Sequence, residues 1–380
     1  MGRILLLVFL ALFLILASTR KWKLFFGLCI ASGVLAVILL FGTVRNSDEG
    51  NGPGRELETV HILFSEDKKG LIQDSAFRDL LKTRFGLVVI GEKYGLEEIP
   101  AAALEGVDGV WAIGPFSESI PENFSSEDSD SKADVLSSPL VIYSWSDILH
   151  TLVGAGIAKI SNDIHYLTDF PRLLQLMREG RTWNTLGLRN MEGTVVLRTA
   201  DPVDSPVGQL SAYLIAEALS ETPSGGSNRA LPPAGLKRLY EIMGPLPDSE
   251  EALFSKFLKQ GPWAYPFAMA TESQIIAFYQ AFPAYREKME SQIRVLYPEP
   301  TLNIPHPFIA FTPKGKRLLD ALNSEEIQQF AAEKYGYRPH PEFVSSPAFL
   351  KMPRLENLLP SPSKSRLRKI KDGLNSLHPQ

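Results

Sequence analysis

The chain has 380 residues, of which 44% are hydrophobic, so it is long enough to bury one large core or two medium ones. Its formal net charge of −4 argues against a nucleic-acid partner. The single cysteine, Cys29, excludes an internal disulfide framework, and the six histidines are scattered without the spacing of zinc ligands. We therefore expect neither a metal site nor a cofactor.

The N-terminus carries two apolar runs. Residues 4–17 and 24–44 flank a short basic loop, and the second run is long enough to cross a bilayer. Basic residues beside a membrane span stay in the cytoplasm, so the rest of the chain is expected outside it. We interpret residues 1–45 as a membrane anchor of one or two transmembrane helices, and residues 46–57 as a linker. The alternative is a cleaved signal peptide.

Strands and helices alternate after the linker. Strands are expected at residues 60–67, 86–95 and 107–118, with a helix at 71–85 between the first two. Such alternation predicts parallel strand pairing with helices on both faces of the sheet, which is an α/β fold. The acidic residues 122–138 are expected to form a surface loop.

The pattern continues through the second half of the chain. It predicts, in order, a strand at 138–145, helices at about 146–160 and 168–180, a strand at 193–202, a helix from Pro206, helices at about 234–244 and 249–260, a strand at 264–273, a helix near 273–290, strands at 293–300 and 306–311, and one or two helices from residue 312.

This order indicates two α/β lobes. The first lobe is expected to comprise residues 58–142 and 271–343, and the second residues 143–270. The chain would then cross between the lobes near 140–145 and 268–272. Two crossings of this kind form a hinge.

The C-terminal residues 344–380 break the pattern. Their prolines predict an extended, weakly ordered segment, followed by a basic cluster between Lys364 and Lys371. The cluster fits a short amphipathic helix that touches anionic lipid headgroups or an acidic partner. The alternative is a solvated, solubilising tail.

Several segments occur in a specific order: "SPLVIYSW", "LLQLMREGRTWNTLG", "GTVVLRTADPVDSPVGQLSAYLIAEAL", "GPWAYPFAMATES", "VLYPEPTLNIPHPFIAF" and "AAEKYGYRP". In this order they resemble the bacterial extracellular solute-binding proteins with the two-lobed type 2 periplasmic-binding fold. In particular they resemble the membrane-anchored branch found alongside von Willebrand A domains. The resemblance covers roughly residues 58–343.

The resemblance implies a membrane-anchored solute-binding protein on the periplasmic or extracellular side of the cell membrane. It would close two lobes around a small polar or anionic ligand, for transport or sensing with a membrane partner such as a transporter permease. The alternative is a ligand-free, membrane-tethered interaction or assembly domain on the same scaffold, since a fold does not by itself fix a function. An enzyme is not expected, because the chain has no nucleophile elbow, dinucleotide fingerprint or P-loop.

The segment from Ser205 to Gly208 is the main candidate for ligand contact. Ser205 is a suitable N-cap and Pro206 suits the first helical position, so the helix would offer amides at Val207 and Gly208 to an anion or a carbonyl. The alternative is that Ser205 only caps the helix.

Other candidate residues follow from the rule that ligands bind beyond the carboxyl ends of the strands in open α/β sheets. These candidates are Ser65, Ser117, Ser144, Thr271 and Glu272. The acidic residues at such strand ends favour a different ligand, a cation or an amine, because clustered carboxylates repel an anion. These acidic residues are Glu66, Asp67, Glu118 and Glu272.

Overall fold

The structure, a computed structural model, describes residues 57–95, 99–121, 124, 129–220, 234–343 and 349–375. The predicted membrane anchor and all of the predicted linker except Leu57 lie outside these ranges. No helix within the described ranges is both long and apolar enough to span a bilayer.

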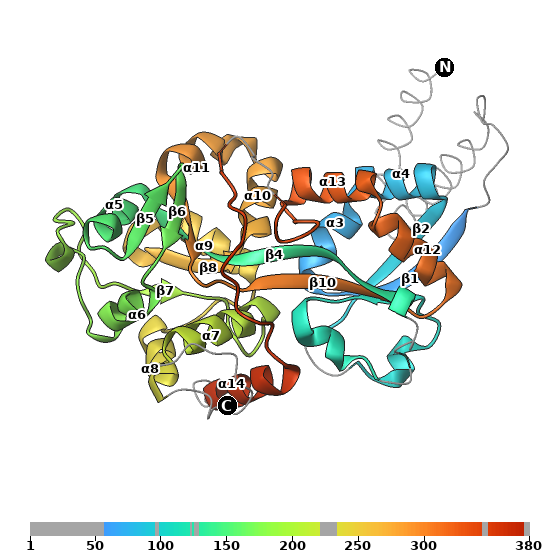
Figure 1. The fold of residues 1–380 in the computed structure, drawn as a ribbon, viewed down its shortest axis with the longest axis horizontal. Coiled ribbons are helices and arrows are strands. Elements are labelled where there is room, and N and C mark those ends of the chain that lie inside the picture. Colours follow the sequence, from blue (N-terminus) through green and yellow to red (C-terminus); the bar gives the residue numbers. More distant parts are fainter. Residues whose placement is uncertain are drawn as a thin grey trace, which may run out of the picture. The chain divides into compact units, whose positions relative to one another are not determined.

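Two α/β lobes share one sheet, whose ten strands all lie in the described part of the chain (Figure 1). The main path through the sheet runs β2-β1-β3-β10-β4-β9-β6-β5, and β8 and β7 extend from β4. The first lobe contains β1 (Glu58–Phe64), η1 (Glu66–Lys68), α3 (Lys69–Gln73), α4 (Ser75–Leu80), η2 (Leu81–Phe85), β2 (Leu87–Lys93), η3 (Ala101–Leu104), β3 (Gly109–Trp111), η4 (Gly114–Ser119), η6 (Ser129–Ser131), the first part of β4 (Lys132–Trp145), β10 (Asn303–Ala310), α12 (Pro313–Leu322) and α13 (Glu325–Tyr335).

The second lobe is formed by the chain between the two parts of the first lobe. It contains the last part of β4, α5 (Ser146–Gly154), β5 (Ala158–Ser161), β6 (Ile164–Leu167), α6 (Phe170–Arg178), η7 (Asn184–Leu186), β7 (Leu197–Arg198), α7 (Pro206–Ala218), α8 (Ala234–Met243), α9 (Glu250–Ala264), β8 (Phe267–Thr271), α10 (Glu272–Ala281), η8 (Pro283–Tyr285), α11 (Arg286–Gln292) and β9 (Ile293–Pro298).

The first strands confirm the predicted parallel pairing. β1 pairs in parallel with both β2 and β3. The helix expected between β1 and β2 is instead divided, because Asp74 adopts extended backbone angles and its carboxylate accepts hydrogen bonds from the amides of Ala76 and Phe77. Gly86 ends the helical stretch at φ 70°, a conformation that a residue with a side chain rarely adopts.

β4 carries the chain from the first lobe to the second. Its residues 132–139 pair with β10, and its residues 140–145 pair with β8 and β9. The return passage is made by the residues between β9 and β10, at 298–303, whereas we expected it near 268–272. β8, which covers 267–271, pairs with the second-lobe part of β4. The strand β4 also begins at Lys132, inside the stretch that was expected to be an acidic loop.

The residues after the first-lobe helices form a structural element of their own, which we call the C-terminal strap (residues 349–375). It runs across β4 and β10 and ends in α14 (Lys364–Asn375), beside α7, α8 and η4 (Figure 1). Leu367, Ile370 and Leu374 of α14 are buried in the large apolar core of the second lobe. The predicted short amphipathic helix is thus present as α14, and its apolar face is covered by the protein itself, whereas contact of its basic residues with lipid stays a prediction.

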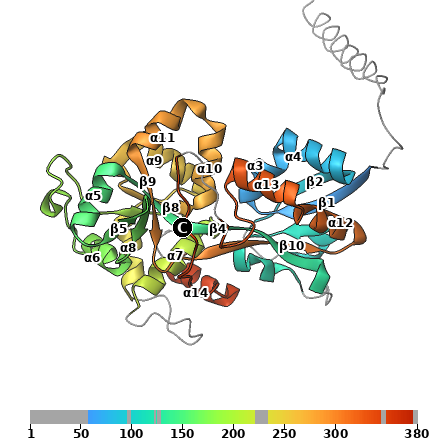
Figure 2. The ribbon, with the colours of Figure 1, turned by 45° about the horizontal axis from the view of Figure 1, so that its top comes forward.

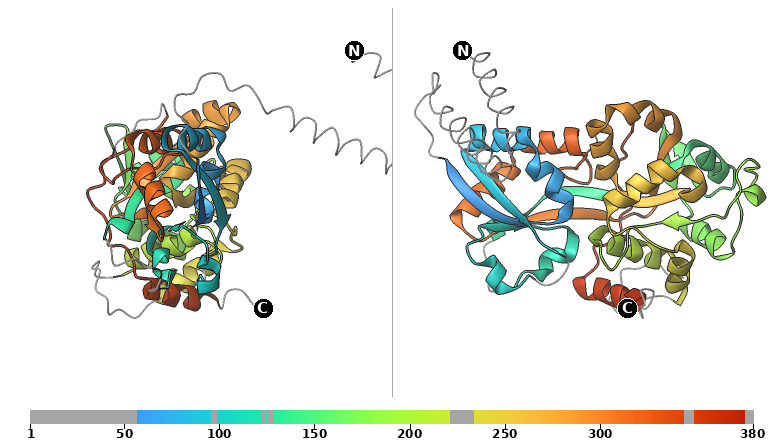
Figure 3. Two further views of the ribbon diagram at one scale, coloured as in Figure 1. Left: turned by 90° about the vertical axis from the view of Figure 1, so that its right-hand side faces the viewer. Right: turned by 180° about the vertical axis from the view of Figure 1, so that it is seen from behind.

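The lobes also meet on a second side, where α10 lies against α13. Gly336, which ends α13, packs so closely on Ile276 of α10 that an added Cβ would stand 2.5 Å from the Ile276 Cβ. Gln280 donates a hydrogen bond to the backbone carbonyl of Glu333 across the same contact. Figures 2 and 3 show from other sides how β4 and β10 link the lobes between these contacts.

Candidate functional site

Two groups of polar side chains, one from each lobe, lie near the end of β1, close enough for their charges to influence one another. Together we call them the interlobe cluster, and its members are Ser65, Asp67, Lys68 and His306 of the first lobe with Glu250 and Thr271 of the second. Ser65 follows β1, and His306 lies on β10. Thr271 ends β8, and Glu250 begins α9. The cluster lies beyond the carboxyl end of a parallel strand, which is where α/β sheets bind ligands.

Lys68 is the centre of the first-lobe part of the cluster. Its side chain is fully buried, and its ammonium donates hydrogen bonds to the carboxylate of Asp67 and, at 3.3 Å, to the hydroxyl of Ser65. The Nζ atom lies 2.5 Å from His306 Nδ1. The rings of Trp111 and Tyr337 flank it, each with its centroid 5.9 Å away.

The charges of this group follow from burial and contact. Burial raises the pKa of Asp67, but the Lys68 ammonium and the His306 hydrogen bond outweigh burial and hold that pKa well below its usual range. Burial and the Lys68 charge lower the pKa of His306 to about 4. His306 is therefore neutral near pH 7, and its Nδ1 lies within hydrogen-bond distance of both the Lys68 ammonium and the Asp67 carboxylate. Its Nε2 atom is buried and has no hydrogen-bond partner among the described residues.

Glu250 provides the second-lobe charge. Its carboxylate accepts hydrogen bonds from the amide of Thr271 and, at 2.5 Å, from the Thr271 hydroxyl. Burial raises the pKa of Glu250 to about 7 against the effect of these bonds, and the charges of Asp67 and Lys68 are near enough to influence it. Glu250 thus changes charge near neutral pH, at the boundary between the lobes.

The Ser205 segment is arranged as a helix cap. The Ser205 hydroxyl accepts a hydrogen bond of 3.1 Å from the Gly208 amide, which was one of the two amides predicted to meet a ligand. Ser205, Val207 and Gly208 are all buried, and a Cβ added at Gly208 would stand 2.5 Å from the Asp201 carbonyl oxygen. Gly208 therefore allows the helix to approach its own preceding loop, and ligand contact at this segment remains a prediction.

Glu272 takes part in a fully buried ion pair. Its carboxylate accepts hydrogen bonds from Arg338 Nε at 2.7 Å and Arg338 Nη2 at 2.6 Å, and from the Tyr297 hydroxyl at 2.6 Å. Both charged side chains are 0% exposed. Arg338 Nη1 also donates to the carbonyl of Pro353 at 2.7 Å. Because Arg338 pairs with Ser137 of β4 through its backbone, the ion pair connects the crossing strand, the second lobe and the strap.

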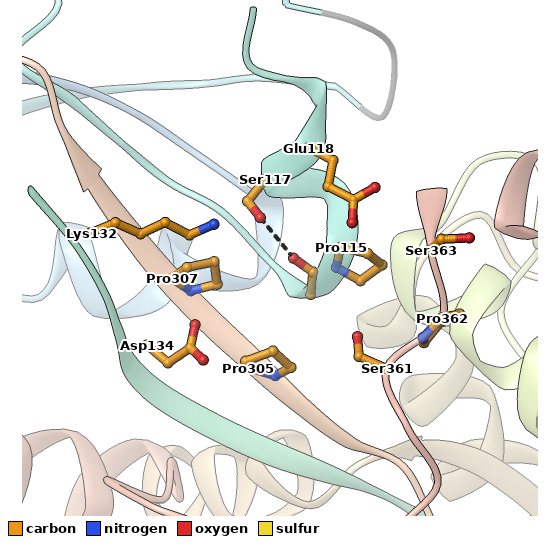
Figure 4. Close-up of a pocket in the computed structure, with 11 residues that line it drawn as sticks. Pro115, Ser117, Glu118, Lys132, Asp134, Pro305, Pro307, Ser361, Pro362 and Ser363 are labelled. Carbon is orange, nitrogen blue, oxygen red and sulfur yellow. Dashed lines mark hydrogen bonds between the residues drawn. The ribbon is translucent and has the colours of Figure 1, made fainter. Parts of the chain in front are cut away.

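Ser117 lies apart from the interlobe cluster, in the wall of a cavity of about 310 Å³ (Figure 4). One wall of the cavity is formed by η4, β4 and β10, and the other by the strap. Ser117 donates to the Gly114 carbonyl, and Glu118 accepts a hydrogen bond from the Lys364 amide at 3.1 Å. The cavity is lined by Gly114, Pro115, Ser117, Glu118, Lys132, Asp134, Pro305, Pro307, Ser361, Pro362 and Ser363.

Ser144 is also separate from the cluster. It is buried in the second-lobe part of β4, where its hydroxyl donates to the Pro266 carbonyl at 3.2 Å. Of the eight predicted residues, the structure brings Ser65 and Thr271 into the interlobe cluster. Glu272 lies next to Thr271 but turns its carboxylate to Arg338 and Tyr297.

Sequence reasoning did not single out three main members of the cluster. Lys68 follows Asp67 in the first turn after β1, Glu250 begins a helix, and His306 lies 238 residues after Lys68. The position of Lys68 after a strand end was a usable signal. By contrast, the return of β10 beside β4, which brings His306 to Lys68, has no local signature in the sequence.

The spacing of Ser65 and Lys68 also occurs in serine hydrolases with a lysine base, but the chemistry here differs. The Ser65 hydroxyl donates to Asp67 Oδ1 at 2.6 Å, and the Lys68 ammonium pairs with the same carboxylate. Burial lowers the pKa of Lys68 and the Asp67 carboxylate opposes this, while the proton of the Ser65 hydroxyl is directed to Asp67 Oδ1 and not to Lys68. The Ser65 hydroxyl is therefore not oriented to give its proton to Lys68.

No family model matches the chain, and no curated protein matches it. Solved structures match it at low identity. A periplasmic thiamin-binding protein is 9% identical, with a TM-score of 0.53, over 86% of this chain and 98% of that one. A two-component signal-transduction protein is 15% identical, with a TM-score of 0.49, over 84% of this chain and 100% of that one.

A third match is the substrate-binding domain of a putative molybdenum ABC transporter from Clostridium difficile. It is 10% identical, with a TM-score of 0.43, over 74% of this chain and 98% of that one. At such identities the likeness concerns the fold alone. The match to the thiamin-binding protein confirms the predicted two-lobed α/β architecture: this chain shares the fold of that periplasmic protein.

Proposed function

We propose that the domain acts outside the cytoplasm as a solute-binding domain, and that it takes a small polar solute at the interlobe cluster. The observation that carries the proposal is the proximity of two polar groups, Asp67, Lys68 and His306 in one lobe and Glu250 and Thr271 in the other, close enough that the charges of Asp67 and Lys68 act on Glu250. Titratable side chains with shifted pKa values gather at binding sites more often than elsewhere. A boundary between two lobes of this fold is also where a solute would be enclosed.

The charges of the cluster favour a solute that carries an amine or another positive charge. Asp67 and Glu250 supply two carboxylates, and Lys68 supplies one ammonium that Asp67 already pairs. The positive end of α7 is capped by the Ser205 hydroxyl, so it gives an oxyanion little support. One structural neighbour is named as thiamin-binding, and thiamin is positively charged. We therefore favour a cationic solute over the anionic one expected at first.

The remaining parts of the proposal concern where the domain is held in the cell and which partner receives the solute. Residues 1–45 would hold the domain at the outer face of the membrane, and a transporter permease or a sensor protein would receive the solute. Support for this comes from the apolar N-terminal runs in the sequence and from the fold. No step of the proposal uses a metal or a cofactor.

A second candidate function is a ligand-free interaction domain. It is favoured by one observation: the Lys68 ammonium already occupies a niche of one carboxylate, one imidazole nitrogen, one hydroxyl and two aromatic rings. Such a niche would suit the amine of a solute, and here the chain fills it with its own side chain.

Native mass spectrometry of residues 55–380, purified from the original host, separates these functions. A small molecule of fixed mass that is retained by the native domain and released on unfolding supports solute binding. Thermal shifts then test the charge, with spermidine and lysine as amines and with sulfate and molybdate as oxyanions. A ligand at 100 times its Kd adds about 2.7 kcal/mol to the unfolding free energy, which is readily seen as a rise in Tm.

The outcomes distinguish the proposals. A shift with amines that disappears in Glu250→Gln supports the cationic solute. A shift with oxyanions alone contradicts the charge assignment but keeps solute binding. No retained molecule and no shift with either group would favour the interaction domain.

A further inference from the structure

The cavity of about 310 Å³ beside Ser117, which we call the strap cavity, lies on the opposite face of β10 from the interlobe cluster. Side chains of a strand point alternately to its two faces. His306 points to Lys68, whereas its neighbours Pro305 and Pro307 line the cavity. The pairing of β10 with β4 shifts its register at this point, and such irregularities are frequent beside binding sites. The strap cavity is therefore a space of its own, which the proposed function does not use.

The apolar part of the cavity wall is rigid. Four proline rings line it, and they come from η4, from β10 and from the strap: Pro115, Pro305, Pro307 and Pro362. A proline ring has almost no side-chain freedom to lose, so it neither rotates into the cavity nor adds an ordering cost when a ligand touches it. A volume of about 310 Å³ is at the lower end of the range for small-molecule sites. The walls therefore suit the apolar group of a small ligand.

Two of the three charged groups that line the cavity have no partner. Lys132 and Asp134 lie two residues apart on β4, and Figure 4 shows their charged ends turned, with that of Glu118, toward the same space. Within the described residues, neither Lys132 nor Asp134 has a hydrogen bond or an ion pair. The Asp134 side chain is open to solvent on one side, but burial still raises its pKa, against the effect of the Lys132 charge. Its carboxylate therefore lacks some of the water that an open surface would provide.

We propose that the strap cavity binds a small zwitterion with an apolar body, such as an amino acid with an aliphatic side chain. Asp134 accepts hydrogen bonds from the ammonium of this ligand, Lys132 donates to its carboxylate, and the proline rings contact its aliphatic group. A zwitterion fits better than a simple amine, which Lys132 would repel, or a simple acid, which Asp134 and Glu118 would repel. This inference goes beyond the proposed function, because it assigns a second site that does not involve the interlobe cluster.

The test uses isothermal titration calorimetry on the full 380-residue chain. The probes are L-leucine and two analogues that each lack one charged group: isoamylamine has no carboxylate, and isocaproate has no ammonium. We expect L-leucine to bind roughly tenfold or more tightly than either analogue, because each analogue loses one set of charge-assisted hydrogen bonds.

Two substitutions remove the charges of the cavity one at a time. Asp134→Asn should weaken L-leucine binding roughly tenfold and should not weaken isocaproate binding, because isocaproate has no ammonium to lose. Lys132→Gln should likewise weaken the binding of L-leucine and not that of isoamylamine. The matched controls are Asp79→Asn and Lys82→Gln, the same changes at exposed positions of the same lobe. Both controls should bind L-leucine as the parent chain does.

The variant Glu250→Gln separates this site from the interlobe cluster, and it should leave L-leucine binding unchanged. Binding that Glu250→Gln abolishes and Asp134→Asn does not change would place the amino acid at the interlobe cluster and overturn the inference. The absence of L-leucine binding to the parent chain at millimolar concentration would overturn it too. Equal losses in Asp134→Asn and its control Asp79→Asn would also contradict it, since the effect would then not belong to the cavity.

Discussion

Replacing Glu272 with alanine tests a fully buried charge of the second lobe. The substitution leaves the Arg338 guanidinium buried without its carboxylate and leaves the Tyr297 hydroxyl without its acceptor. Three hydrogen bonds to the carboxylate are lost, two of them from a charged donor. Arg338 keeps its bonds to backbone carbonyls, including that of Pro353, so the charge is partly compensated.

The size of the effect follows from these contacts. Breaking one partner of a buried ion pair costs about 3–5 kcal/mol, and a buried hydroxyl left unpaired adds about 1 kcal/mol. With the carbonyls still in place, we expect Glu272→Ala to lower the unfolding free energy by about 4 kcal/mol. Urea unfolding followed by tryptophan fluorescence measures this value.

The double variant Glu272→Leu with Arg338→Met removes both charges and fills the space with apolar side chains. It should recover most of the loss, because replacing a whole buried pair is often neutral. A loss below about 1 kcal/mol for Glu272→Ala would refute the reasoning, since it would mean that water reaches Arg338. Such a small loss would also mean that a ligand could reach the carboxylate of Glu272, as the sequence analysis predicted.

Other substitutions test the cap, the strap and the interlobe charge. Gly208→Ala forces a Cβ against the Asp201 carbonyl and should cost about 1–3 kcal/mol by urea unfolding; a neutral result would mean that the loop yields freely. Ile370→Ala should cost about 3 kcal/mol because the side chain is fully buried, whereas Lys369→Ala on the exposed face should change stability by less than about 0.5 kcal/mol. The pKa of Glu250 is about 7 in the folded chain and near 4.5 ordinarily. Between pH 4.5 and about pH 7 the native state therefore holds a proton that the unfolded chain has lost, and the unfolding free energy falls as the pH rises through this range. The unfolding free energy of Glu250→Gln should therefore rise relative to that of the parent chain by up to about 3 kcal/mol as the pH goes from 5 to 8. A Tm difference between variant and parent that is equal at both pH values would contradict the shifted pKa.

Much of the fold was predictable because its elements have local signals. The apolar run of β1 and the Ser205–Pro206 start of α7 mark elements that the structure contains, with bounds that differ by a few residues. The short hairpin of β5 and β6 was missed, because four-residue strands around Asn162 carry too little pattern. The expected helix at 146–160 therefore continued into a strand.

The candidate site was predictable only in part. A strand end is visible in the sequence, so Ser65 and Thr271 were named. Which partner a polar side chain binds depends on contacts between segments that are distant in the sequence. Glu272 accepts a hydrogen bond from Arg338, 66 residues later, and Lys68 contacts His306, 238 residues later. Neither choice follows from periodicity or spacing.

The position of β10 also sets the order in which the protein can be completed during synthesis. β10 lies between β3 and β4 and pairs antiparallel with both, although it is made long after them. Until the ribosome has released residues 303–310, β3 and the first part of β4 have open edges with unpaired backbone groups. Such edges invite pairing with other chains, so the nascent protein is most exposed to aggregation while its second lobe is being made.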